Sequence, residues 1–150
     1  MLIRTHIAFV SLLIILFVTH VTDKFVFMVF ALIGAVIPDI DTGFSTWGKH
    51  FIFKPIQFFL KHRTMIHSLT FGILITILIA AFFPVLSFGF FLGFASHLLL
   101  DSFTKDGILP FWPLSYKSSG FISTGRRIEG TFFITLIAID LLIIAFYLIF

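Results

Sequence analysis

The sequence predicts an all-α fold: a polytopic membrane helix bundle of about five transmembrane helices, with an interfacial segment between the second and the third. Three observations predict this fold. Of the 150 residues, 59% are hydrophobic and only 11% are charged, whereas a soluble domain carries roughly a quarter charged residues. The mean hydropathy is +1.17. Five apolar runs are separated by proline, glycine and charged residues, and residues 1–150 are expected to form a single membrane-embedded domain.

The first feature to justify is the set of helices. The second run is expected to end at Pro38, because the proline ring opposes further helix. Only the third and fifth runs approach the ~20 residues of a full membrane span. Thr64 is a candidate N-cap for the third helix, and Gly89 and Gly93 in the fourth are spaced for close contact between helices. The helices are expected over about 7–22, 25–38, 65–83, 85–101 and 130–150.

Two longer segments connect these helices. Residues 44–61 combine aromatic and aliphatic side chains with lysines, which predicts a helix lying on the inner leaflet. A re-entrant or irregular loop is the alternative for that segment. Glycines and prolines in the segment 102–127 argue against a helix there, and Phe111 and Trp112 are expected to hold it at the membrane interface.

The distribution of basic residues predicts the orientation in the membrane. With five crossings, the side that holds the N-terminus receives every Lys and Arg except Lys24. Because cytoplasmic loops carry an excess of these residues, the expected location is the inner (cell) membrane, with the N-terminus in the cytoplasm and the C-terminus outside. The net charge of +3 is small and spread over short loops, so no nucleic-acid partner is expected.

Ionisable side chains gather at the same cytoplasmic end. His97 and Asp101 are four residues apart, so on a helix they share one face and can bind one metal ion together. Capping of a helix end is the alternative for this pair. Ionisable residues inside a membrane are costly and by default indicate function. The predicted topology brings to the same end as this pair His6, Asp39, Asp41, His62, His67 and Glu129.

This convergence predicts a divalent metal site. The chain has no cysteine, so a transition metal would be held by His, Asp or Glu, and several His residues favour Zn²⁺, with Mn²⁺ as the alternative. Arg63 is better suited to a phosphate or a carboxylate than to a metal. The segment from Asp39 to Asp41 follows a helix stop and is expected to be extended. His20 and His50 are expected to be ordinary imidazoles, and Asp140 is open between proton transfer and a contact with another helix.

The motifs occur in a fixed order that resembles a known family. They are Thr5-His6, Pro38-Asp39-Ile40-Asp41, His62-Arg63-Thr64 with His67-Ser68, and Ser96-His97 with Asp101. Over roughly residues 5–110 the set resembles the YdjM-like inner-membrane metal-dependent hydrolases. That family is similar in turn to zinc-dependent phospholipase C and related single-strand nucleases, which are helical enzymes that hydrolyse phosphoesters. The resemblance implies as metal ligands His6, Asp39, His62, His67, His97 and Asp101.

The expected function is therefore that of a membrane-bound metal-dependent hydrolase acting on a phosphoester such as a phospholipid headgroup. The metal would lower the pKa of a bound water toward ~7, and Arg63 would stabilise the developing charge. Asp41 or Asp101 would accept the proton. The alternatives are a metal transporter, which predicts polar residues continuing across the membrane, and a metal-binding interaction module without catalysis. The expected partners are the lipid bilayer and a lipid or phosphoester substrate.

Overall fold

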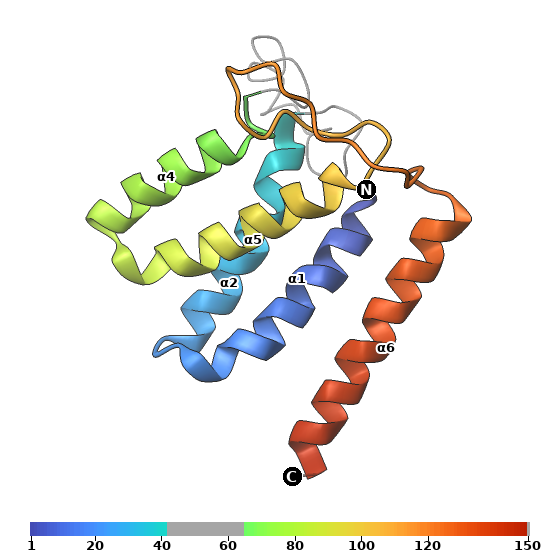
Figure 1. Cartoon of the computed structure of the whole chain (residues 1–150). Coiled ribbons are helices and arrows are strands. Elements are labelled where there is room, and N and C mark those ends of the chain that lie inside the picture. The colour runs from blue at the N-terminus through green and yellow to red at the C-terminus, as the bar shows by residue number, and fades with distance from the viewer. Residues whose placement is uncertain (42–64, 150) are drawn as a thin grey trace.

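The computed structural model describes residues 1–41 and 65–149, which form five α-helices and no β-strand. Figure 1 shows these helices arranged as a bundle. The all-α prediction is confirmed. The short 3₁₀ segments η1 (Val18–His20) and η2 (Ile37–Asp41) follow the first two helices. The α-helices are α1 (Ile3–Phe17), α2 (Lys24–Val36), α4 (Leu69–Phe82), α5 (Pro84–Ser102) and α6 (Arg127–Ile149).

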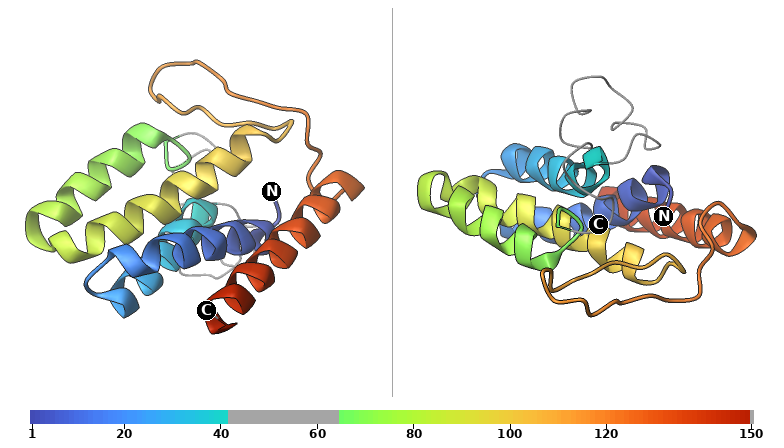
Figure 2. Two further views of the ribbon diagram at one scale, coloured as in Figure 1. Left: turned by 60° about the horizontal axis from the view of Figure 1, so that its bottom comes forward. Right: turned by 90° about the horizontal axis from the view of Figure 1, so that it is seen from above.

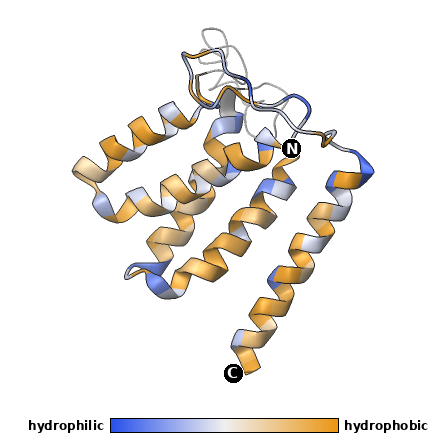
Figure 3. Ribbon diagram, viewed as in Figure 1, coloured by the Kyte–Doolittle hydropathy of each residue, from blue (hydrophilic) through white to orange (hydrophobic). Residues whose placement is uncertain are grey.

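Successive helices run in alternating directions. The N-terminus, the end of α5 and the start of α6 lie at one end of the bundle, and the C-terminus lies at the other (Figure 1). We call the first of these the polar end, because hydrophilic colours gather there while the helices are mostly hydrophobic (Figure 3). Within residues 1–41 and 65–149, three helical segments are long and apolar enough to cross a membrane, namely 3–20, 84–102 and 127–149.

The third predicted helix is shorter than expected. It was predicted over 65–83, but α4 begins only at Leu69 and has 14 residues. The N-cap is Ser68, whose hydroxyl accepts from the Phe71 amide at 3.1 Å and donates to the Met65 carbonyl at 2.6 Å. The prediction that Thr64 caps this helix is therefore wrong. Serine and threonine stabilise a helix start in the same way, so either residue could cap this helix. The cap is Ser68, and the helix therefore begins at Leu69.

The close packing of α2 against α5 depends on glycines. An added Cβ on Gly93 would lie 1.9 Å from the Ala31 carbonyl oxygen, and one on Gly34 would lie 2.2 Å from the Phe90 carbonyl oxygen. An added Cβ on Gly89 would lie 2.7 Å from the Phe27 carbonyl oxygen. Only glycine allows two helix backbones to come this near. The contact predicted for Gly89 and Gly93 is confirmed, and it fixes the register of α5 on α2.

The last helix lies at the edge of the bundle. It packs against α1, which runs parallel to it from the polar end (Figures 1 and 2). The Arg4 guanidinium on α1 lies 5.2 Å from the centre of the Phe133 ring. The opposite face of α6 exposes large apolar side chains such as Leu142 and Leu148, as expected of a helix that meets lipid.

The segment between α5 and α6 is not helical, as predicted. Isolated bridges pair Thr104 with Ile122 and Ile108 with Ser118. The Leu69 amide donates to the Pro110 carbonyl at 2.8 Å, which joins this loop to the start of α4. The loop therefore covers the polar end. The interfacial helix predicted over 44–61 lies outside the residues that the structure describes.

Candidate metal centre

A buried cluster of imidazoles and carboxylates occupies the polar end of the bundle. Its members come from separate parts of the chain: α1, η2, the turn before α4, and the last two turns of α5. The His side chains are 1% exposed or less, and Asp101 is equally buried. Asp39 is 9% exposed. The cluster consists of His6, Asp39, His67, His97 and Asp101, all of which the sequence predicted as metal ligands.

The packing of α2 on α5 positions one side of this cluster. One turn after the glycine contact at Gly93, His97 faces the end of α2, and its Nδ1 lies 2.7 Å from the Ala35 carbonyl oxygen. The chain beyond Pro38 was predicted to be extended, but it winds into the 3₁₀ segment η2. A proline is compatible with the first turn of a helical segment, so the chain continues to wind and places Asp39 against His97.

Two imidazoles and two carboxylates face one another at the centre of the cluster. The His97 Nε2 lies 3.7 Å from Asp39 Oδ1 and 3.8 Å from Asp101 Oδ2. The His67 Nε2 lies 3.9 Å from each of the same two oxygens. These distances exceed those of hydrogen bonds. They are close to the separation of about 3.4 Å between two ligands that each lie ~2.1 Å from one tetrahedral zinc ion.

The orientation of the His97 ring would allow it to act as a metal ligand. A carbonyl oxygen can only accept, so the Nδ1 that meets Ala35 must carry the hydrogen, and the Nε2 of the neutral ring then carries the lone pair. This Nε2 has no hydrogen-bond partner among the described residues. A lone pair that faces two carboxylate oxygens is repelled by them unless a cation lies between. The residues present therefore fit a divalent metal ion.

The fifth member, His6, contacts the cluster from α1. Its ring stacks on that of His97 with the centroids 3.8 Å apart and the planes 5° apart. Its Nε2 lies 3.4 Å from Asp101 Oδ1, which also accepts from the Met1 ammonium group. Asp101 thus directs one oxygen to His6 and the other to His67 and His97. Two overlapping groups with ligand atoms within 4.8 Å result, and they share His97.

Glu129 lies beside the cluster and accepts hydrogen bonds from the chain around it. It is 1% exposed and lies in the first turn of α6. Its Oε1 accepts from the Leu2 amide at 2.5 Å and from the Thr5 hydroxyl at 3.1 Å, and its Oε2 accepts from the Gly125 amide at 2.5 Å. These hydrogen bonds satisfy donors at the start of α1, next to His6. Sequence reasoning left the role of Glu129 open.

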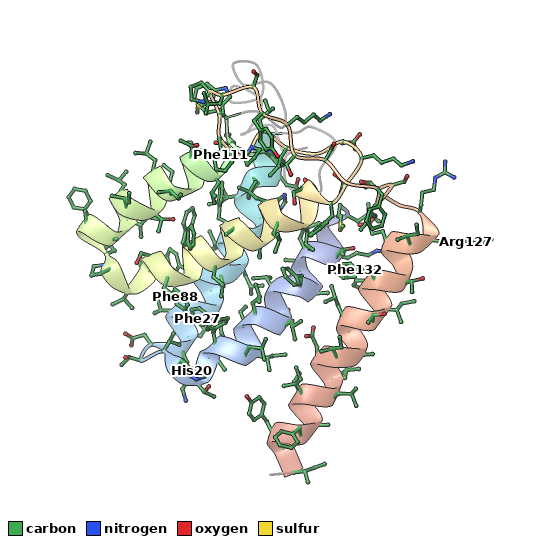
Figure 4. All side chains as sticks on the ribbon, in the orientation of Figure 1. His20, Phe27, Phe88, Phe111, Arg127 and Phe132 are labelled. Atoms are coloured by element: carbon green, nitrogen blue, oxygen red, sulfur yellow. The ribbon has the colours of Figure 1, made fainter. Side chains whose placement is uncertain are left out.

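The remaining predicted residues lie elsewhere. His62 and Arg63 fall outside the described residues, and the Asp41 side chain is not described. His20 is exposed at the opposite end of the bundle, where Figure 4 labels it, and its Nδ1 lies 3.1 Å from the Thr19 hydroxyl. Asp140 is buried within α6 at 6% exposure, and its Oδ1 has no hydrogen-bond partner in the described part of the chain.

Asp39 is the acidic residue of the cluster that lies outside the candidate spanning helices, and burial changes the pKa of its carboxyl. It raises the pKa of the Asp39 carboxyl, while the charges of His6 and His67 act in the opposite direction. A buried carboxylate is costly without a positive partner. A bound cation would add further positive charge at Asp39 beside the imidazoles, which agrees with the donor geometry.

Comparisons with known proteins agree with the membrane fold. A family model described as YdjM inner membrane protein matches residues 1–150. An uncharacterized protein YvsG from Bacillus subtilis (strain 168) is 35% identical over 89 residues, which are 57% of this chain and 56% of that protein. The inner membrane protein YdjM from Escherichia coli (strain K12) is 33% identical over 99 residues, 58% of this chain and 49% of that protein. The chain thus spans about half the length of the curated relatives it matches. No solved structure matches.

Proposed function

We propose that this chain, which belongs to the YdjM inner membrane protein family, is a membrane-bound metal-dependent hydrolase of phosphoesters, with a phospholipid headgroup as the substrate. The observation that carries the proposal is the orientation of His97. Its Nδ1 meets the Ala35 carbonyl, and its Nε2 faces Asp39 and Asp101. A ring held in this way is a preorganised metal ligand. The same family membership supports residence in the inner membrane, and we propose that the polar end faces the cytoplasm.

The chain's own residues divide the work of the site. Asp39, His67, His97 and Asp101 would hold one Zn²⁺, with Mn²⁺ as the alternative, and His6 would buttress Asp101. A metal in this site supplies a Lewis acid and a water that ionises near neutral pH. We assign phosphate binding to Arg63, because a guanidinium matches two phosphate oxygens at once. Asp41 follows Asp39 by two residues and is the proposed proton acceptor, since both oxygens of Asp101 are engaged within the cluster.

The position of the cluster supports a lipid substrate. The imidazoles lie at the end of a bundle in which three of the described helices are long and apolar enough to cross a membrane. A site at the end of the spanning helices would lie at the depth of the lipid headgroups, outside the hydrocarbon core. Phospholipid headgroups carry phosphoesters. A soluble phosphoester would approach the same end from water, so the experiment must compare the two.

The test uses the full chain in nanodiscs. Hydrolysis of phospholipids is measured as purified, after chelation, and after Zn²⁺ is added back, with a water-soluble phosphodiester in parallel. We expect turnover of the lipid to be lost on chelation and restored by zinc, and Asp101→Asn to lose both zinc and turnover. His20→Ala is the matched control, because His20 lies at the opposite end of the bundle, and it should keep both.

Two results would overturn parts of this proposal. Equal lipid turnover with and without chelator would exclude a metal-dependent mechanism. Stoichiometric zinc without turnover of any phosphoester would support the metal site and contradict the hydrolase activity. In that case zinc uptake into proteoliposomes decides between the transporter and a metal-binding interaction module without catalysis.

A further inference from the structure

An apolar groove lies on the side of α5 that faces away from the metal centre. Its volume is about 610 Å³, within the range of roughly 300–1,000 Å³ typical of ligand sites. The α5 residues that line it recur at helical spacing and share one face. His97 and Asp101 lie on the other side of the same turns. The lining residues of α5 include Phe91, Leu92, Ala95, Leu99 and Ser102.

Three other parts of the chain complete the groove. Phe9 and Leu13 of α1 form one wall, Leu69 contributes from the start of α4, and the loop between α5 and α6 contributes Phe111 and Tyr116 at the polar end. Figure 4 labels Phe111 in this loop. The groove therefore begins at the loop and extends along the neighbouring spanning helices α1 and α5 toward the middle of the bundle.

The two serines that α5 contributes to the groove do not offer hydrogen-bond donors to an occupant. The Ser96 hydroxyl donates to the Gly93 carbonyl at 2.7 Å, and the Ser102 hydroxyl donates to the Leu99 carbonyl at 2.6 Å. Both bonds stay within α5. The helical part of the groove consequently presents hydrocarbon surface, and an apolar occupant loses no hydrogen bond on entering it.

Large apolar side chains around the groove are uncovered. Leu99 and Phe111 are each 49% exposed, and Tyr116 is 63% exposed. Exposed apolar surface that lines a concave site indicates a binding region rather than scattered exposure. Because α1 and α5 are candidate membrane spans, the medium at the open side of the groove is the hydrocarbon of the bilayer.

We infer that this groove binds one acyl chain of a bilayer phospholipid. At its loop end the groove is lined by the hydroxyl-bearing residues Tyr116 and Ser118. Lys117 lies between them in the sequence and is exposed, outside the groove lining. Hydroxyls at the groove end and a basic residue in the same loop match an anionic headgroup phosphate, so the headgroup lies at the loop and the chain runs along α5. Lipid binding in the groove does not require hydrolysis. It is linked to the proposed function because the bound headgroup would lie at the same membrane depth as Asp101, which directly precedes the groove residue Ser102.

The experiment maps lipid contacts on the full chain. Nanodiscs of phosphatidylethanolamine and phosphatidylglycerol contain a small fraction of phosphatidylcholine with a diazirine in one acyl chain, and adducts formed by light are located by mass spectrometry. We expect adducts to concentrate on the groove residues of α1 and α5 relative to the lipid-facing side of α6. Ala95→Trp fills the groove and should reduce those adducts several-fold. Ala145→Trp, at an exposed α6 position, should leave them unchanged.

The outcomes separate this inference from the proposed function. Equal adduct density on the groove and on α6 would overturn lipid binding there, whatever the turnover. Groove adducts in a chain that never hydrolyses lipid would uphold the inference and count against the enzyme. Leu99→Gln is the second variant if Ala95→Trp does not fold, because Leu99 is half exposed and its change creates no overpacking. Unchanged adducts in both folded variants would overturn the inference.

Discussion

The contact between Glu129 and the start of α1 predicts a large loss of stability on truncation. Its carboxylate accepts hydrogen bonds from Leu2, Thr5 and Gly125, and each hydrogen bond to a charged group contributes about 1.5–3 kcal/mol. Such contributions are not additive, and removing one side leaves buried donors unsatisfied. We therefore expect Glu129→Ala to lower the free energy of unfolding by about 3–5 kcal/mol. Unfolding by dodecyl sulfate in mixed micelles, followed by circular dichroism, measures this loss.

Two further variants divide the effect into its parts. Thr5→Val removes one hydroxyl donor to the carboxylate and should cost about 1.5–3 kcal/mol. Glu129→Gln retains one oxygen but replaces the other with a donor, so it should lie between the two. Because Thr5 precedes His6, the Glu129 variants that still fold should also bind zinc roughly 10-fold more weakly, as when a residue supporting a metal ligand is changed. If Glu129→Ala is no less stable than Thr5→Val, the role assigned to Glu129 is wrong.

Three further predictions concern the metal centre and its support. His97→Ala should abolish stoichiometric zinc, measured per chain by elemental analysis, whereas His20→Ala should retain it; zinc in both variants would exclude His97 as a ligand. Gly93→Ala should lower stability by about 1–3 kcal/mol, because its Cβ would lie 1.9 Å from the Ala31 carbonyl oxygen; an unchanged melting temperature in detergent would contradict the close approach of α2 and α5. Burial raises the pKa of the Asp39 carboxyl, so this group takes up a proton at higher pH than an exposed aspartate. Zinc affinity should therefore fall as pH is lowered, since protons compete for the ligands, and the fall should begin at a higher pH than for a site with an exposed aspartate. Competition with a chelator across a pH series measures the trend, and a pH-independent affinity would contradict it.

The sequence predicts the helices better than their boundaries. Apolar runs and Pro38 are sufficient to locate five helices, because membrane helices depend mainly on local hydropathy. The start of α1 at Ile3, four residues before the predicted boundary, depends on Glu129, which lies more than a hundred residues away and accepts from Leu2. Such a contact between distant residues leaves no local pattern. The Ser68 cap was missed because Thr64 offered the same chemistry four residues earlier.

The convergence of five predicted side chains at one end of the bundle could be predicted from the sequence, whereas their geometry could not. Alternating helices bring His6, Asp39, His67, His97 and Asp101 to one end whatever the exact packing, so the topology is enough to collect them. Which oxygen meets which ring nitrogen depends on the register of α2 against α5, which the glycine spacing indicates only as a contact. The link between His97 and Ala35 could not be predicted, because a main-chain oxygen is present at every residue.

The main-chain origin of the hydrogen-bond acceptor for His97 has a consequence for how the site tolerates mutation. The acceptor that sets the tautomer of His97 belongs to the backbone at Ala35, so no side-chain replacement at that position deletes it. With the rotamer of His97 unchanged, a sliding of α5 along α2 would break the hydrogen bond. The protonated nitrogen of this single ring therefore reports helix register, and a nitrogen chemical shift of His97 would reveal a displacement of the two helices even when the chain remains folded.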